Sequence, residues 1–218
     1  MTPLEPWERV FVGEKFFEGA HGEMDCIICH LGNPQVRSDK EAAHEDLVPY
    51  PSEDPEYFCA SCHETEVENF EQSLHFSQAG YFERFERRAG FSLKDPGYEH
   101  ALEEFNNECG QCHASCGQCH VSRPRSVQGG FVQGWAHEFK KSPSMSENCT
   151  ACHGSRIGEE YTGASPDVKA DYHYITLAQS CEFCHSGYEM HGGDGTHLTY
   201  RYDENNTAAP QCETCHVQ

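Results

Sequence analysis

Residues 109–120 read Cys-Gly-Gln-Cys-His-Ala-Ser-Cys-Gly-Gln-Cys-His and contain the pentapeptide Cys-x-x-Cys-His twice, with only Ala114 and Ser115 between the copies. The chain of 218 residues holds seven copies, which use all 14 of its cysteines. The cysteine pairs are Cys26 and Cys29, Cys59 and Cys62, Cys109 and Cys112, Cys116 and Cys119, Cys149 and Cys152, Cys181 and Cys184, and Cys212 and Cys215. The histidines that close the motifs are His30, His63, His113, His120, His153, His185 and His216. No cysteine is left for a structural disulfide, a lipid anchor or a nucleophile.

This pentapeptide is the attachment site of c-type haem. The two thiols add across the vinyl groups to form thioethers, and the adjacent histidine binds the iron from one face. A zinc site would use two Cys-x-x-Cys pairs per metal, which leaves one of seven pairs over. Redox-active disulfides also occur at this spacing, but neither alternative explains a histidine after every second cysteine. The sequence therefore predicts seven covalently attached haem c groups.

A second set of eight histidines lies outside the motifs. An iron held by one histidine has a second axial position to fill, so seven irons and eight further histidines allow bis-histidine ligation at every site, with one to spare. Two alternatives compete with this interpretation. Methionine could fill the second axial position, where it raises the reduction potential. A lone histidine, in turn, is more often a hydrogen-bonded surface side chain than a ligand. The number and spread of these histidines favour iron ligation. They are His21, His44, His75, His100, His137, His173, His191 and His197.

On these motifs, which span residues 26–216, the chain resembles the multihaem c-type cytochromes. In haem density and histidine supply it is similar to the subunits of extracellular cytochrome filaments. That resemblance implies long-range electron transport with copies of the chain itself as partners, and a histidine donated from one subunit to a haem of the next, for which His21 is the first candidate. Other cytochromes or redox proteins, and extracellular acceptors such as metal oxides, are the further partners expected.

Two other functions stay open. One is a soluble periplasmic electron carrier or complex subunit. The other is a multihaem reductase with one open iron, although the Cys-x-x-Cys-Lys motif of the related nitrite reductases does not occur in this chain.

The formal charge of −21, from 15 basic and 36 acidic residues, bears on the partners. A surface this acidic repels nucleic acid, which proteins bind by neutralising its phosphates with Lys and Arg. It suits basic proteins, metal cations and positively charged mineral surfaces. No run of 18 apolar residues is present, so no membrane-spanning helix is expected. Residues 1–17 do not form a signal peptide, and because haem c is attached outside the cytoplasmic membrane we expect a mature, exported chain that is periplasmic or extracellular.

The fold class follows from the low apolar content. Hydrophobic residues make up 37% of the chain, and its mean hydropathy is −0.73. We predict mostly irregular coil with short α-helices and little or no β-structure, templated by a chain of seven haems within a single domain over residues 1–218. Helices are expected over 64–88, with a break at Gly80, over 98–108 and over 167–179. The proline-rich segment 46–56 is expected to be an extended loop, and 122–130 a possible hinge.

Overall fold

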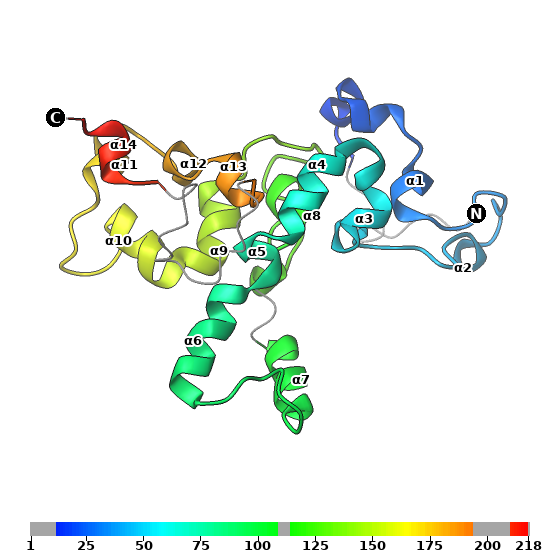
Figure 1. The fold of residues 1–218 in the computed structure, drawn as a ribbon. Helices are drawn as coiled ribbons and strands as arrows, with labels where there is room; N and C mark the ends of the chain where they lie inside the picture. The colour runs from blue at the N-terminus through cyan, green and yellow to red at the C-terminus, as the bar shows by residue number, and fades with distance from the viewer. Residues whose placement is uncertain (1–11, 109–113, 194–209, 218) are drawn as a thin grey trace.

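Short helices, many of a single turn, follow one another along the chain (Figure 1). The structure is a computed structural model, which describes residues 12–108, 114–193 and 210–217. The α-helices are α1 (Cys26–His30), α2 (Lys40–Ala43), α3 (Pro55–Phe58), α4 (Ala60–Glu71), α5 (Leu74–Ser77), α6 (Ala79–Ala89), α7 (Glu99–Glu108), α8 (Cys116–His120), α9 (Thr150–His153), α10 (Glu159–Thr162), α11 (Tyr172–Ile175), α12 (Cys181–Cys184), α13 (Gly187–Met190) and α14 (Cys212–Cys215). Tighter 3-10 turns are η2 (Glu14–Glu18), η3 (Ala20–Glu23), η4 (Pro51–Glu53) and η6 (Arg125–Val127), and π-helical turns are η7 (Met145–Cys149) and η8 (Gly154–Gly158).

The expected fold class is confirmed: the described ranges contain short helices and coil but no strand. Their one β-pairing is an isolated antiparallel bridge between Ser122 and Phe131.

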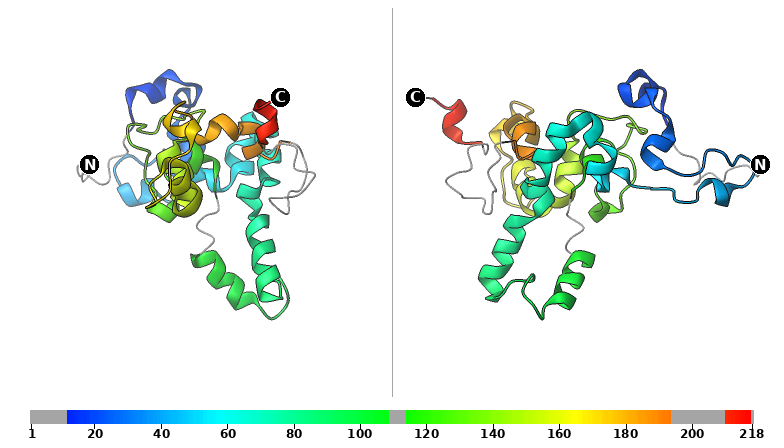
Figure 2. Two further views of the ribbon diagram at one scale, coloured as in Figure 1. Left: turned by 90° about the vertical axis from the view of Figure 1, so that its left-hand side faces the viewer. Right: turned by 45° about the vertical axis from the view of Figure 1, so that its right-hand side comes forward.

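The body is elongated, with α1 and α2 at one end and α11 and α14 at the other (Figure 1). Between these ends lie α4, α8, α9 and α13. Helices α6 and α7 project from the body as a hairpin, which remains separate from it when the molecule is turned (Figure 2). Aromatic contacts hold the hairpin together, since Phe105 of α7 lies 4.9 Å from Phe82 of α6 and Phe91 stacks on Tyr98 at 4.1 Å in the connection between the helices.

Three of the expected element boundaries are corrected by the structure. The helical region 64–88 does not break at Gly80, which lies inside α6, but at two earlier points. Ser73 begins α5 by accepting a hydrogen bond from the Phe76 N–H, and Gln78, which adopts a left-handed conformation, separates α5 from α6. Segment 46–56 is not fully extended, because it forms η4 and enters α3, where Asp54 caps the first turn. Proline suits the first turn of a helix, where its missing N–H costs nothing. The helix expected over 167–179 is limited to α11, whereas the one over 98–108 is confirmed as α7.

The loop proposed as a hinge is tied at several points. The buried Asn148 side chain donates to the carbonyls of Gln118 (2.7 Å) and Ser122 (2.8 Å) and accepts from the Ser144 N–H. Arg125 pairs with Glu53 at 2.7 Å. These bonds join α8, the loop and η7, and so hold two Cys-x-x-Cys-His motifs in a fixed relation. Whether 1–218 forms a single domain stays a prediction.

The buried apolar core of the described residues is very small. Only Val67, Phe70, Leu93, Phe105 and Val132 are buried hydrophobic side chains there. Many large apolar side chains are instead exposed, and several lie within or next to the motifs, such as Ile27, Ile28, Phe183 and Val217. A polypeptide with this distribution has apolar surface suited to packing against a large apolar cofactor.

Candidate haem-binding site

Each described motif forms one turn of helix or begins one. Helices α1 and α8 contain a complete motif, α9 ends at His153, and α12 and α14 run from the first cysteine to the second. Residues three apart are neighbours on a helix surface, so the two thiols of a motif lie side by side with the histidine directly after them. This arrangement presents two sulfurs and an imidazole to one ligand, as covalent haem attachment requires.

Five motif histidines each face one histidine from outside the motifs. The ring centres are 5.8–6.1 Å apart in all five pairs. The pairs are His30 with His137, His63 with His21, His120 with His191, His153 with His75, and His216 with His173.

The separation within these pairs matches two axial ligands of one metal. Because a metal–imidazole bond is about 2 Å long, two imidazoles on opposite sides of one metal have ring centres about 6 Å apart. Ordinary aromatic pairs also fall in this range, but ordinary packing would not select one motif and one non-motif histidine each time. The geometry of the described residues therefore fits one metal ion held between the two imidazoles of each pair.

The backbone around His30 and His137 shows how such a pair is held. His30 accepts the Val48 N–H at its carbonyl (2.8 Å), and its Nδ1 lies 2.8 Å from the Val48 carbonyl. His137 and the preceding Ala136 both have left-handed dihedrals, with φ of 71° and 47°. Left-handed conformations are uncommon for such residues and cluster at functional sites.

His191 reaches His120 through a close helix contact. It follows α13, and the next residue, Gly192, has a left-handed φ of 68° and lies against α4. A Cβ at Gly192 would lie 2.6 Å from the Asn69 carbonyl oxygen, so only glycine allows this approach. His120 in turn is fixed to Lys140 by the same reciprocal pair of bonds as His30, with its Nδ1 2.6 Å from the Lys140 carbonyl.

His21 and His75 come from turns on different parts of the chain. His21 in η3 stacks on Phe139 at 4.1 Å and faces His63, which departs from helical dihedrals within α4. His75 lies in α5, which Ser73 caps, and faces His153 at the end of α9. Because His21 faces a histidine of its own chain, the geometry gives no support to its donation to a neighbouring subunit.

The protonation of these histidines also suits metal binding. Burial lowers the pKa of His21, His75, His137 and His191, and the facing motif histidine lowers each of them further. A lowered pKa favours the neutral imidazole, the form that binds metals.

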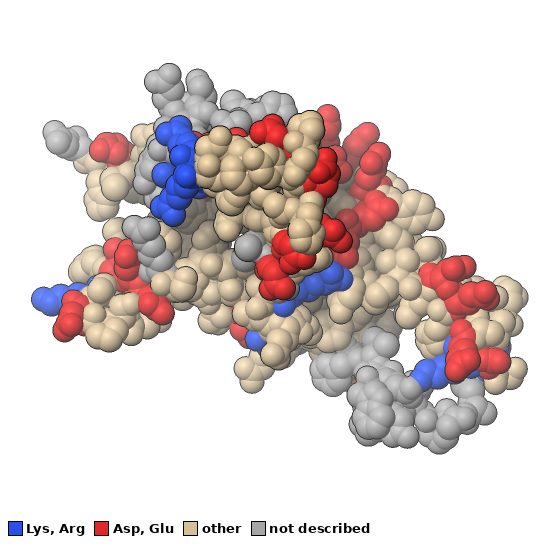
Figure 3. Space-filling model, turned by 90° about the horizontal axis from the view of Figure 1, so that it is seen from below, with Lys and Arg blue, Asp and Glu red and all other residues tan. Residues whose placement is uncertain are grey.

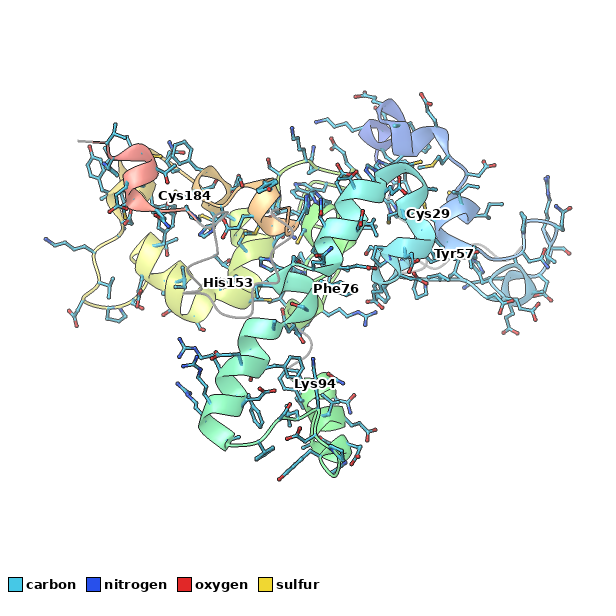
Figure 4. The ribbon with its side chains drawn as sticks, viewed as in Figure 1. Cys29, Tyr57, Phe76, Lys94, His153 and Cys184 are labelled. Atoms are coloured by element: carbon cyan, nitrogen blue, oxygen red, sulfur yellow. The ribbon has the colours of Figure 1, made fainter. Side chains whose placement is uncertain are left out.

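Thiols of different described motifs also lie near one another. A hydrogen bond with Cys116 is the main cause that raises the pKa of Cys59. The pKa of four other thiols is raised mainly by burial and next by the charge of a thiol in another motif. These thiols, each with its neighbour, are Cys29 (Cys59), Cys119 (Cys152), Cys149 (Cys181) and Cys184 (Cys215). Six motifs therefore follow one another in space in chain order, with Cys29 and Cys184 toward opposite ends of the body (Figure 4). The motif at 109–113 lies outside the described residues.

Two predicted ligands face no motif histidine of the described residues, and a third cannot be placed among them. His44 is exposed, with its Nδ1 2.7 Å from the Lys40 carbonyl, and His100 is exposed on α7. His197 lies outside the described residues. On the motif side, the described residues place no imidazole opposite His185, whose Nδ1 lies 3.0 Å from a Glu189 carboxylate oxygen.

Twelve cysteines of the described ranges carry free thiols, and no group of three or more Cys, His, Asp or Glu side chains there could hold a metal ion by itself.

Carboxylates are spread over much of the face shown in Figure 3, in keeping with the negative formal charge. Among the described helices none is long and apolar enough to cross a bilayer.

Residues 58–154 match the family described as cytochrome c554 and c-prime. The matched segment is less than half of the chain and contains four of the seven motifs, those that begin at Cys59, Cys109, Cys116 and Cys149. The match supports a multihaem c-type cytochrome that carries covalently bound haem c and transfers electrons. Searches of curated proteins and of solved structures gave no match.

Proposed function

We propose that the chain holds seven covalent haem c groups, each with two histidine ligands, and that it conducts electrons along them. The five facing histidine pairs carry this proposal, because each provides two imidazoles at the separation that one iron requires. Haem supplies one-electron chemistry when bound; the chain's residues attach it, fix its orientation and close both axial positions.

The proposed ligands are assigned as follows. His137, His21, His191, His75 and His173 serve the motifs that end in His30, His63, His120, His153 and His216, respectively. The motifs that end in His113 and His185 take their second ligands from His44, His100 and His197, with one histidine to spare. The order in which thiols of the six described motifs neighbour one another supports a single file of sites from α1 to α14, which suits conduction between the two ends of an elongated body.

Long-range extracellular transport as a filament subunit is the finer form of the proposal. An elongated chain with sites at both ends can continue the file across a subunit boundary, and head-to-tail association of identical subunits that does not close into a ring produces filaments. A soluble periplasmic carrier would use the same sites as a monomer.

One sample tests both levels of the proposal. Haem is counted against protein by mass spectrometry of the purified holoprotein, and the oxidised form is examined by electron paramagnetic resonance. We expect seven haems per chain, all low-spin. Fewer haems would contradict the count, and a high-spin signal from about one haem in seven would favour a reductase with an open iron. Electron microscopy and sedimentation of the same sample separate filament from monomer.

A further inference from the structure

Among the proposed ligands, the Nδ1 atoms that make a hydrogen bond have two kinds of partner. In His30 and His120 the partner is a backbone carbonyl, of Val48 and Lys140. In His185 and His173 it is a carboxylate: Glu189 Oε2 at 3.0 Å and Asp171 Oδ1 at 2.9 Å. Since Nδ1 is the hydrogen-bonding atom in all four, Nε2 is the nitrogen left for iron.

Each carboxylate is placed by a short local structure. Glu189 lies four residues after His185, within α13, which begins where Ser186 Oγ accepts the Glu189 N–H. Asp171 caps α11 by accepting the His173 N–H at 2.8 Å, and the same oxygen lies against His173 Nδ1. The bonds therefore depend on side chains within four residues of each ligand.

The kind of partner changes the basicity of the histidine ligand. A carboxylate that accepts from the second nitrogen of a metal-bound imidazole raises the basicity of that ligand. A more basic ligand stabilises ferric iron, which carries one more positive charge than ferrous iron, and hydrogen bonding around the site is one of the means by which proteins set haem potentials. A neutral carbonyl does this more weakly, because hydrogen bonds to ionised groups are roughly twice as strong.

We propose that Glu189 and Asp171 are positioning residues that make His185 and His173 strongly donating ligands, so that the haems of the Cys181 and Cys212 motifs are more reducing than those of the Cys26 and Cys116 motifs. This rests on the proposed function, because it assumes iron at those histidines. The two motifs are neighbours at the α14 end of the body (Figure 1). The two ends of the chain therefore differ in reduction potential, and electrons pass from the α14 end, where the potential is lower, toward the α1 end.

Burial ranks the two carboxylates. The Glu189 side chain is 13% exposed and the Asp171 side chain 45% exposed. Water competes less with a shielded hydrogen bond, and a shielded charge acts through a lower dielectric. Glu189 therefore has the larger effect of the two on its histidine ligand.

The test uses two nearly isosteric variants and one matched control in the full holoprotein. Glu189→Gln and Asp171→Asn retain an acceptor oxygen but remove its charge, and asparagine remains a good helix cap. Glu182→Gln is the control: Glu182 lies between the cysteines of the same motif as His185, and its buried Oε2 atom makes no hydrogen bond. Potentiometric titration followed by electron paramagnetic resonance gives the potentials and the g values of the low-spin haems.

We expect Glu189→Gln to move one haem to a more positive potential and to change its g values, and Asp171→Asn to do the same to another haem by a smaller amount. The control should shift a potential without changing g values, because it leaves the axial ligand untouched. If Glu189→Gln changes the g values no more than Glu182→Gln does, the carboxylate acts only as a nearby charge and the inference is wrong. A wild-type protein without histidine-ligated low-spin haem would instead contradict the proposed function itself.

Discussion

At the scale of single residues, the assignment of His21 is the most direct to test. Its ring faces His63 of the same chain at 6.0 Å and stacks on Phe139. Replacing His21 by alanine should turn one haem in seven from low-spin to high-spin, because its iron loses the sixth ligand. The electron paramagnetic resonance spectrum measures this fraction directly.

The matched control is Phe139→Leu, which removes the stacked ring but keeps the imidazole and should remain low-spin. Dilution of the wild-type protein gives a second check. An intrachain ligand stays bound at any protein concentration. A high-spin signal that grows on dilution of the wild-type protein, and that is already complete and independent of concentration in His21→Ala, would show that His21 serves another copy after all.

At the scale of elements, the contact between α13 and α4 should depend on Gly192. A methyl group there would meet the Asn69 carbonyl oxygen at 2.6 Å, and the left-handed φ of 68° adds backbone strain. Such strain costs about 1–3 kcal/mol. Gly192→Ala should lower the thermal stability of the holoprotein and displace His191 from His120, which would give a high-spin haem. Gly187→Ala, in α13 but with open space around it, is the control and should change neither property.

The elements also show what the sequence could predict. The motif residues and the short helices follow from local spacing, because covalent attachment needs only a pentapeptide on one turn. Which histidines face each other does not, since each pair is between about 40 and 110 residues apart and depends on contacts such as that of Gly192. Sequence reasoning also missed Glu189 and Asp171. Their positions four residues after His185 and two before His173 were the available signal, but such spacings are common by chance.

At the scale of the whole molecule, the protein's own apolar core is too small to account for its order. The described ranges bury five hydrophobic side chains, whereas several apolar residues within or beside the motifs are exposed. Fixing a backbone costs about 1–2 kcal/mol per residue, and burying one large apolar side chain returns about 1.5–3 kcal/mol. Covalently attached macrocycles would supply the missing apolar contacts, as metals do for small metal-dependent domains.

The last prediction follows from that balance: the chain without haem should not fold. Expressed in the cytoplasm, where haem c is not attached, it should show the circular dichroism of a disordered chain and no cooperative thermal transition, whereas the holoprotein should be helical and melt cooperatively. Amide resonances of the haem-free chain should be poorly dispersed. The measurement is made under reducing conditions, so that disulfides between the 14 free thiols do not impose structure of their own. A haem-free chain with the helical content of the holoprotein would mean that the polypeptide determines the fold by itself and that haem occupies sites already formed.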